Sequence, residues 1–140
     1  MSDAVTLVSR FLAGIGEGRW LELADFYADD VVVDQPFSAP SRLRIVGREA
    51  VREHFAAAAQ RPMRLVPGNI VIHTTSDPEV VIAEFDYDVE NTATGGHSTV
   101  ANVQLFRIRD GRFVETRDYH DHLRLAAAFG RAGALAAALD

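Results

Sequence analysis

Hydrophobic positions in the first half of the chain recur with the period of an α-helix. Between Asp3 and Ile15 the apolar residues lie three or four positions apart, which predicts an amphipathic helix. The same spacing predicts a short helix from Trp20 to Tyr27 and a third helix from Arg48 to Gln60. Between these helices, Val31–Val33 is predicted to be a short strand, and the segment from Asp34 to Val46 an irregular loop.

The second half changes to the two-residue alternation that is typical of strands. The predicted strands are Leu65–Val66, Ile70–Thr75, Glu79–Glu90, Ser98–Arg109 and Arg112–His120. Turn signals such as Asp110-Gly111 separate the longer strands. A last helix is expected from His122 to Phe129, and the Ala- and Leu-rich tail adds one or two helical turns. Helices followed by an antiparallel meander predict an α+β fold, one domain over 1–140, with the helices on one face of a curved sheet.

Composition excludes several classes of function. The formal net charge of −6 weighs against a nucleic-acid partner, because phosphate neutralisation needs clustered cations. The absence of cysteine excludes a disulfide framework, a thiolate nucleophile and a zinc-thiolate site. No signal-like or membrane-spanning apolar run is visible, so we expect a cytoplasmic protein with no membrane partner.

The last predicted strand carries the main candidates for chemistry. Asp118, His120 and His122 follow one another at spacings of two, and side chains two apart project from one face of a strand. A carboxylate and an imidazole side by side can transfer protons near neutral pH if their face points into an enclosed space. Three ligands from one strand edge seldom converge on an ion, so we expect no metal site. His122 is expected to begin the final helix and to contact solvent.

Polar and aromatic side chains on two further strands are expected to face the same interior. Phe85 and Tyr87 alternate with acidic residues, which predicts an apolar inner face and a solvated outer face. Asn102 and Gln104 share a face with neighbouring apolar residues, and a bound ligand or water would satisfy their buried amides. His54 lies on the apolar stripe of the third helix, where a core histidine is the simpler interpretation.

Two segments carry a resemblance to the nuclear-transport-factor-2-like superfamily. GRWLELADFYADDVVVDQP resembles the helix-to-strand opening of that superfamily, and FRIRDGRFVETRDYHD resembles its closing hairpin. The similarity is greatest to SnoaL-like proteins, which include polyketide cyclases, steroid isomerases and limonene-type epoxide hydrolases. It implies a cone-shaped, strongly curved, mostly antiparallel sheet that encloses a pocket with three N-terminal helices, followed by a short C-terminal helix. It also implies that Asp118 faces the pocket as a catalytic acid or base.

The chain departs from two of these chemistries. Where steroid isomerases have a Tyr and an Asp as oxyanion hole, Phe11 and Gln104 stand here. Their general-base Asp corresponds to Gln35, with Asp34 one residue away. The Arg and Asp of the epoxide hydrolases correspond to Phe85 and Tyr87.

The sequence therefore predicts a cofactor-independent acid/base enzyme of the isomerase, cyclase or hydrolase type, acting on a small hydrophobic molecule with a polar group. The expected catalytic residues are Asp118, His120 and Asp34. The expected substrate-binding residues are Gln35, Gln104, Asn102, Tyr87, Phe85, Trp20, Phe11 and Tyr27. Which of Asp34 and Gln35 faces the pocket is left open. A homodimer formed through the outer sheet face is expected, and the alternative function is a non-catalytic ligand-binding protein of the same fold.

Overall fold

The computed structural model describes residues 3–139, and its elements follow the predicted order of helices and then strands. They are α1 (Asp3–Gly16), η1 (Trp20–Phe26), β1 (Tyr27–Gln35), β2 (Leu43–Val46), α2 (Arg48–Ala59), β3 (Met63–Thr74), β4 (Val80–Asn91), β5 (Gly96–Arg109), β6 (Arg112–His120), α3 (His122–Ala128) and α4 (Ala132–Ala138). The α+β class, the curved and mostly antiparallel sheet and the short C-terminal helix α3 are confirmed.

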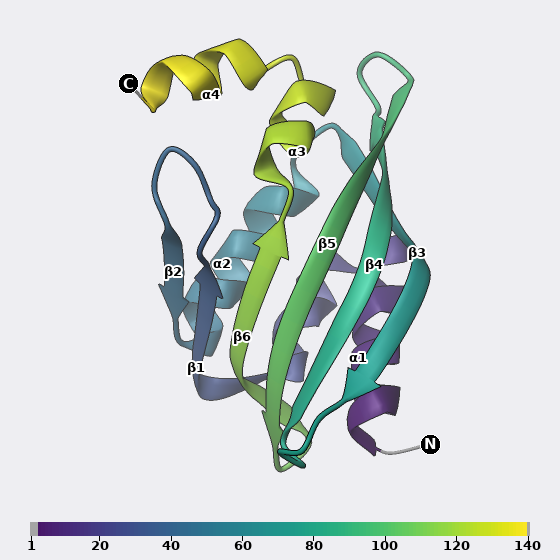
Figure 1. The fold of residues 1–140 in the computed structure, drawn as a ribbon, viewed down its shortest axis with the longest axis vertical. Helices are drawn as coiled ribbons and strands as arrows, with labels where there is room; N and C mark the ends of the chain where they lie inside the picture. Colours follow the sequence, from purple (N-terminus) through teal and green to yellow (C-terminus); the bar gives the residue numbers. More distant parts are fainter. Residues whose placement is uncertain (1–2, 140) are drawn as a thin grey trace.

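Within the described residues, six strands form one sheet in the order β2-β1-β6-β5-β4-β3 (Figure 1). The pairing of β1 with β6 is parallel, and the other neighbours are antiparallel. The register of β5 and β6 places Gln104 opposite Asp118 and Asn102 opposite His120. Facing residues of neighbouring strands project from the same side of the sheet, so these four side chains form one polar group on the inner face.

Helices α1 and α2 lie on one side of the sheet, while α3 and α4 lie beyond the end where β6 finishes (Figure 1). The core fills the space between the sheet and the first two helices. Phe11 of α1 lies near its centre, with ring centroids 5.2–5.9 Å from those of Phe26, Tyr27, Phe106 and Phe113. This aromatic cluster holds α1 and η1 against the sheet and fixes one wall of the interior.

Three details of the first half of the chain differ from the sequence predictions. The strand predicted at Val31–Val33 extends over the whole of β1, and the segment predicted as loop contains β2, because the two strands pair through backbone hydrogen bonds that periodicity does not report. The short second helix is a 3₁₀-helix. The tail forms α4, as predicted.

The two strands predicted at Leu65–Val66 and Ile70–Thr75 are one continuous strand, β3. Its pairing with β4 shifts between Gly68 and Val71, and Asn69 between them has a φ of 52°. An irregularity of this kind interrupts the alternation without ending the strand. Pro67 is tolerated because β3 lies at the edge of the sheet, where one side of the strand needs no hydrogen-bond donor.

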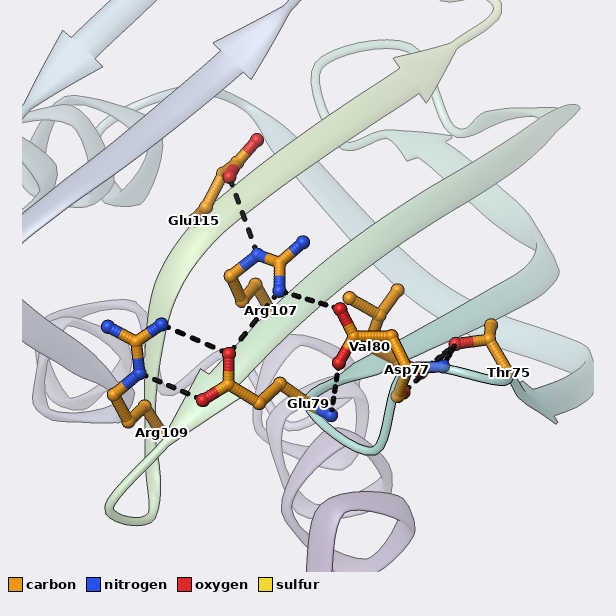
Figure 2. Close-up of polar contacts among 7 residues, drawn as sticks. All are labelled: Thr75, Asp77, Glu79, Val80, Arg107, Arg109 and Glu115. Carbon is orange, nitrogen blue, oxygen red and sulfur yellow. Dashed lines mark hydrogen bonds and ion pairs between the residues drawn. The ribbon is translucent and has the colours of Figure 1, made fainter.

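An ion-pair network joins the turn between β3 and β4 to the neighbouring strands, away from the interior (Figure 2). The Arg107 guanidinium contacts Asp77 at 2.9 Å, Glu79 at 3.3 Å and Glu115 at 3.8 Å. Arg109 contacts Glu79 with both Nε and Nη2, at 2.9 and 3.0 Å. The Glu79 backbone amide, which donates to Asp77 at 3.0 Å, and Arg107 lower the pKa of Asp77, and Arg109 and Arg107 lower that of Glu79. Both carboxylates therefore stay charged, and the network is structural.

Among the helices of residues 3–139, none is long and apolar enough to span a lipid bilayer.

Candidate functional site

A cavity of about 620 Å³ lies between the inner face of the sheet and the helices. This volume is within the ~300–1,000 Å³ range of small-molecule sites. Aromatic side chains from the helices, strands and C-terminal segment line it: Phe11, Trp20, Tyr27, Phe55, Tyr87 and Phe129. Residues of α3 and α4, including Leu125 and Leu135, close the end beyond β6. The cavity is therefore large enough for a small organic ligand and mostly apolar.

Asp118 is a carboxylate inside this cavity. It is 5% exposed and shares the inner face of β6 with the fully buried Thr116. Among the described residues, its Oδ1 atom has no hydrogen-bond partner, and the same holds for Gln104 Oε1 and Thr116 Oγ1. Buried polar atoms without partners are rare, because each loses its interaction with water without replacement. Three such atoms on neighbouring positions indicate a place where a ligand or water is expected to bind.

Burial raises the pKa of Asp118 to about 6, because the apolar surroundings disfavour the charged form. The nearby side chains of Gln104, Thr116 and Gln35 act in the opposite direction by favouring the carboxylate, and they only partly offset the burial. A carboxyl group with this pKa exchanges protons near neutral pH, which an ordinary exposed aspartate does not.

His120 lies two residues further along β6 and also lines the cavity. Its Nδ1 is 2.7 Å from Asn102 Oδ1, and the amide nitrogen of Asn102 donates to Val100 O at 2.9 Å. Because an amide oxygen only accepts, His120 Nδ1 carries the proton and Nε2 keeps its lone pair. Burial, together with His122 and His54, lowers the pKa of His120 to about 3. The imidazole is therefore neutral near pH 7 and can accept a hydrogen bond from a ligand.

His54 and His122 line the same cavity. From the sequence we expect His54 in the packed core and His122 in contact with solvent, and both expectations are wrong in part. The apolar stripe of α2 faces the cavity at His54, and burial and the charge of Arg61 lower the pKa of His54. His122 begins α3 as predicted, but it is half-buried and burial lowers its pKa. No periodicity in the sequence could have distinguished a cavity from a packed core.

The structure shows which of the neighbouring side chains Asp34 and Gln35 faces the cavity. Gln35 and Val33 line the cavity, while Asp34 between them does not. Asp34 instead binds Arg42 through both carboxylate oxygens, and the hydrogen bond from Arg42 lowers the pKa of Asp34. Alternation along β1 turns Asp34 to the other side of the sheet from the cavity. Its charge still helps to raise the pKa of Asp118, and its catalytic role stays a prediction.

The remaining predicted ligand-binding residues lie in or beside the cavity. Phe11, Trp20, Tyr27, Tyr87, Asn102 and Gln104 line it. Phe85 does not: its ring packs against Tyr87, with the ring centroids 5.1 Å apart. Burial and the charge of Asp118 raise the pKa of both Tyr27 and Tyr87, so these phenols stay protonated and can donate hydrogen bonds.

The polar groups that line the cavity fit acid/base chemistry best. In the part of the chain that the structure describes, no group of three or more His, Cys, Asp or Glu side chains is placed to hold a metal ion. Among the described residues, the site contains one carboxyl group able to gain or lose a proton and three imidazoles with lowered pKa values, of His54, His120 and His122. Amide and phenol groups can orient a polar substituent.

Sequence and structural comparisons assign the chain to a family. Residues 8–116 match the SnoaL-like domain. The chain belongs to the SnoaL-like family. An uncharacterised PhzA/B-like protein of Pseudomonas aeruginosa is 29% identical over 114 residues, which cover 76% of this chain and 75% of that protein.

Solved structures agree with this assignment. A provisionally named isomerase from Bacillus subtilis is 25% identical and has a TM-score of 0.84, with 93% of this chain and 96% of that chain covered. A provisionally named polyketide cyclase from Xanthomonas campestris is 21% identical and has a TM-score of 0.77, with 90% and 96% covered. The NTF2-like fold expected from the sequence is thereby confirmed.

Proposed function

We propose that this SnoaL-like protein is a cofactor-independent enzyme that isomerises, cyclises or hydrates a small hydrophobic molecule, with Asp118 as the acid/base group. The observation that carries the proposal is the burial of Asp118 in an apolar cavity, with polar side chains beside it and a pKa of about 6. A protein that only binds an apolar ligand gains nothing from a buried carboxylate, whose desolvation is costly. A proton-transfer catalyst needs such a group.

In the proposed reaction, Asp118 first acts as a base. With a pKa of about 6, about nine in ten molecules carry the carboxylate at pH 7. The carboxylate removes a proton from a carbon next to a carbonyl, and the protonated Asp118 then returns it to another atom of the substrate. The amides of Gln35 and Gln104 can donate hydrogen bonds to the enolate oxygen, and His120 Nε2 can accept one from a substrate hydroxyl. For an epoxide, the same carboxylate would instead activate a water molecule.

The names of similar proteins support this class of reaction without naming the substrate. The Bacillus subtilis protein bears the name of an isomerase and the Xanthomonas campestris protein that of a polyketide cyclase. Isomerisation and cyclisation are two of the reaction types in the proposal.

The test uses simple model substrates. We would follow α-proton exchange of 2-tetralone in D₂O by ¹H NMR, and hydrolysis of 1-methylcyclohexene oxide by gas chromatography. Wild-type protein is expected to accelerate at least one reaction, and Asp118→Asn to slow it by roughly 10²–10⁴. Asp110→Asn, in the turn between β5 and β6, is the matched control and should retain the wild-type rate.

Two outcomes would contradict the proposal. Full activity in Asp118→Asn would remove Asp118 from the mechanism. Wild-type protein that leaves both reactions at the buffer rate would favour the alternative function, a ligand-binding protein of the same fold.

We further propose that the protein is a homodimer. Apolar side chains are exposed on the outer face of the sheet and beside it, among them Val71 at 50% and Val103 at 39%. A patch of this kind is a common protein–protein contact. A cytoplasmic location stays a prediction.

A further inference from the structure

The charged groups around the cavity have an unusual balance. The protein as a whole has a formal net charge of −6, yet Asp118 is the one acidic residue among the described residues that line the cavity. Two arginines, Arg61 and Arg131, line it as well. By contrast, a second pocket, which extends from the outer face of β4 and β5 to the C-terminal helices, includes Glu84, Asp86 and Asp121 and no arginine. The cavity lining therefore has more arginines than acidic residues, whereas the chain as a whole has more acidic residues than arginines.

Neither arginine is neutralised by the described part of the protein. Ion pairs occupy Arg19, Arg42, Arg48, Arg52, Arg107 and Arg109. Arg61 and Arg131 have no ion-pair partner within residues 3–139. Other arginines on the surface also lack ion pairs, but among the described residues only these two line the cavity, where Asp118 is the one acidic group. Two arginines free to bind at one cavity mouth can hold an anion from outside the chain.

Both arginines lie at the end of the cavity where the C-terminal helices sit. Arg61 follows α2, and Arg131 connects α3 to α4, which lie beyond the end of β6 (Figure 1). Both side chains are exposed, so they mark the mouth of the cavity rather than its floor. Arg61 is close enough to the cavity to lower the pKa of His54. The Nε2 atom of His122, at the start of α3, is buried and without a partner among the described residues.

We propose that the ligand is an amphipathic carboxylic acid whose carboxylate binds Arg61 and Arg131 at the mouth. Its apolar body would lie against the aromatic wall, and its reacting carbon near Asp118. This inference rests on the proposed function for the reaction, although the binding preference can be measured without it. The ligand is a carboxylate because a planar, singly charged group matches the planar donor face of a guanidinium.

The proposed orientation also avoids two electrostatic costs. A carboxylate at the exposed mouth keeps contact with water, so its desolvation is small compared with burial in the apolar floor. It also stays away from Asp118: His120 is already about 7 Å further along β6, at ~3.3 Å per residue, and the mouth lies beyond it at the C-terminal helices. Repulsion between the ligand carboxylate and ionised Asp118 is weak at such a separation.

The test compares a carboxylate with its uncharged analogue. The probes are 4-cyclohexylbutanoate and 4-cyclohexylbutanamide, and the readout is the fluorescence of Trp20, which lines the cavity and is the single tryptophan of the sequence. Wild-type protein should bind the carboxylate more tightly than the amide. Arg61→Gln and Arg131→Gln should each weaken carboxylate binding by about 3- to 10-fold, the range of one ordinary hydrogen bond, because the contact stays exposed to water, and leave amide binding unchanged.

Arg124→Gln is the matched control, because Arg124 is an exposed arginine of α3 that does not line the cavity. It should retain the preference for the carboxylate, whereas the Arg61→Gln/Arg131→Gln double variant should lose it. Equal binding of both probes by wild-type protein, binding of neither, or an unchanged preference in the double variant would overturn the proposal. Asp118→Asn should still prefer the carboxylate, so failure of the catalytic proposal and failure of this one give different results.

Discussion

His120 Nδ1 and Asn102 Oδ1 lie 2.7 Å apart on neighbouring strands of the sheet, at directly paired positions of β6 and β5. The amide of Asn102 is itself fixed by donation to Val100 O, so its oxygen is directed at the imidazole. This contact decides the tautomer of His120 and leaves Nε2 as the atom available to a ligand. A second side chain therefore positions the histidine, as is common at catalytic and binding sites.

The first prediction concerns this tautomer. The ¹⁵N shifts of His120 should show the neutral Nδ1–H form from pH 8 down to about pH 5, because the pKa of this imidazole is lowered to about 3. Long-range ¹H–¹⁵N correlation spectra would measure it. Asn102→Ala removes the acceptor and should introduce the Nε2–H form. A charged imidazolium at pH 7 in wild-type protein would contradict this prediction.

The second prediction concerns pH-dependent stability. Because the pKa of Asp118 is raised from 3.8 to about 6, its contribution to stability is fully present below about pH 4 and is lost as the pH rises through about 6. Asp118→Asn cannot ionise, so it escapes this loss. Relative to wild type, its free energy of unfolding should increase by about 2 kcal/mol between pH 4 and pH 8. Urea denaturation at several pH values would measure the difference.

Asp34→Asn provides a control of opposite sign. Arg42 lowers the pKa of Asp34, so the stability from this pair is present above the unfolded pKa and is lost as the pH falls through the folded one. The variant should therefore show its largest deficit at neutral pH and approach wild type in acid. If both variants changed in the same direction with pH, the assignment of the two carboxyl groups would be wrong.

The third prediction concerns the pH profile of activity. If Asp118 is the base, the rate of α-proton exchange should rise with pH through about 6, because the ionised form is the active one. Asp118→Asn should be slower by roughly 10²–10⁴ and should lose this inflection. A profile that falls through about 6 would instead make the protonated Asp118 the acting acid.

The fourth prediction concerns the aromatic cluster under the cavity. Phe11 is 1% exposed and contacts several rings, so Phe11→Ala should lower the free energy of unfolding by about 3 kcal/mol or more. Leu21→Ala, at a side chain that is 66% exposed, should change it by less than about 0.5 kcal/mol. Equal effects of the two substitutions in urea denaturation would show that this cluster does not support the fold.

The fifth prediction concerns the proposed homodimer. Sedimentation equilibrium at micromolar concentration should give about twice the chain mass of 15.3 kDa. Val103→Glu places a charge on the outer face of β5 and should shift the protein to the monomer, because an unpaired charge at an interface is costly. Wild-type protein that sediments as a monomer would rule the dimer out.

The sequence by itself determined the order of the elements and the contents of the closing strand. The alternation along β6 placed Asp118 and His120 on one face, and the Asp110-Gly111 turn set the hairpin that pairs them with β5. Period and turn signals are local properties of the chain, so they can be recognised without knowing which segments meet.

Only the tertiary structure decided which groups share the cavity. Pairing of β1 with β2 and β6 turned Gln35 inward and Asp34 outward, and the same alternation would have allowed the reverse. His54, Arg61 and Arg131 line the cavity because of where α2 ends and where α3 and α4 lie relative to the sheet. Burial, and with it the raised pKa of Asp118, arises from contacts between residues far apart in sequence, so no local pattern could contain it.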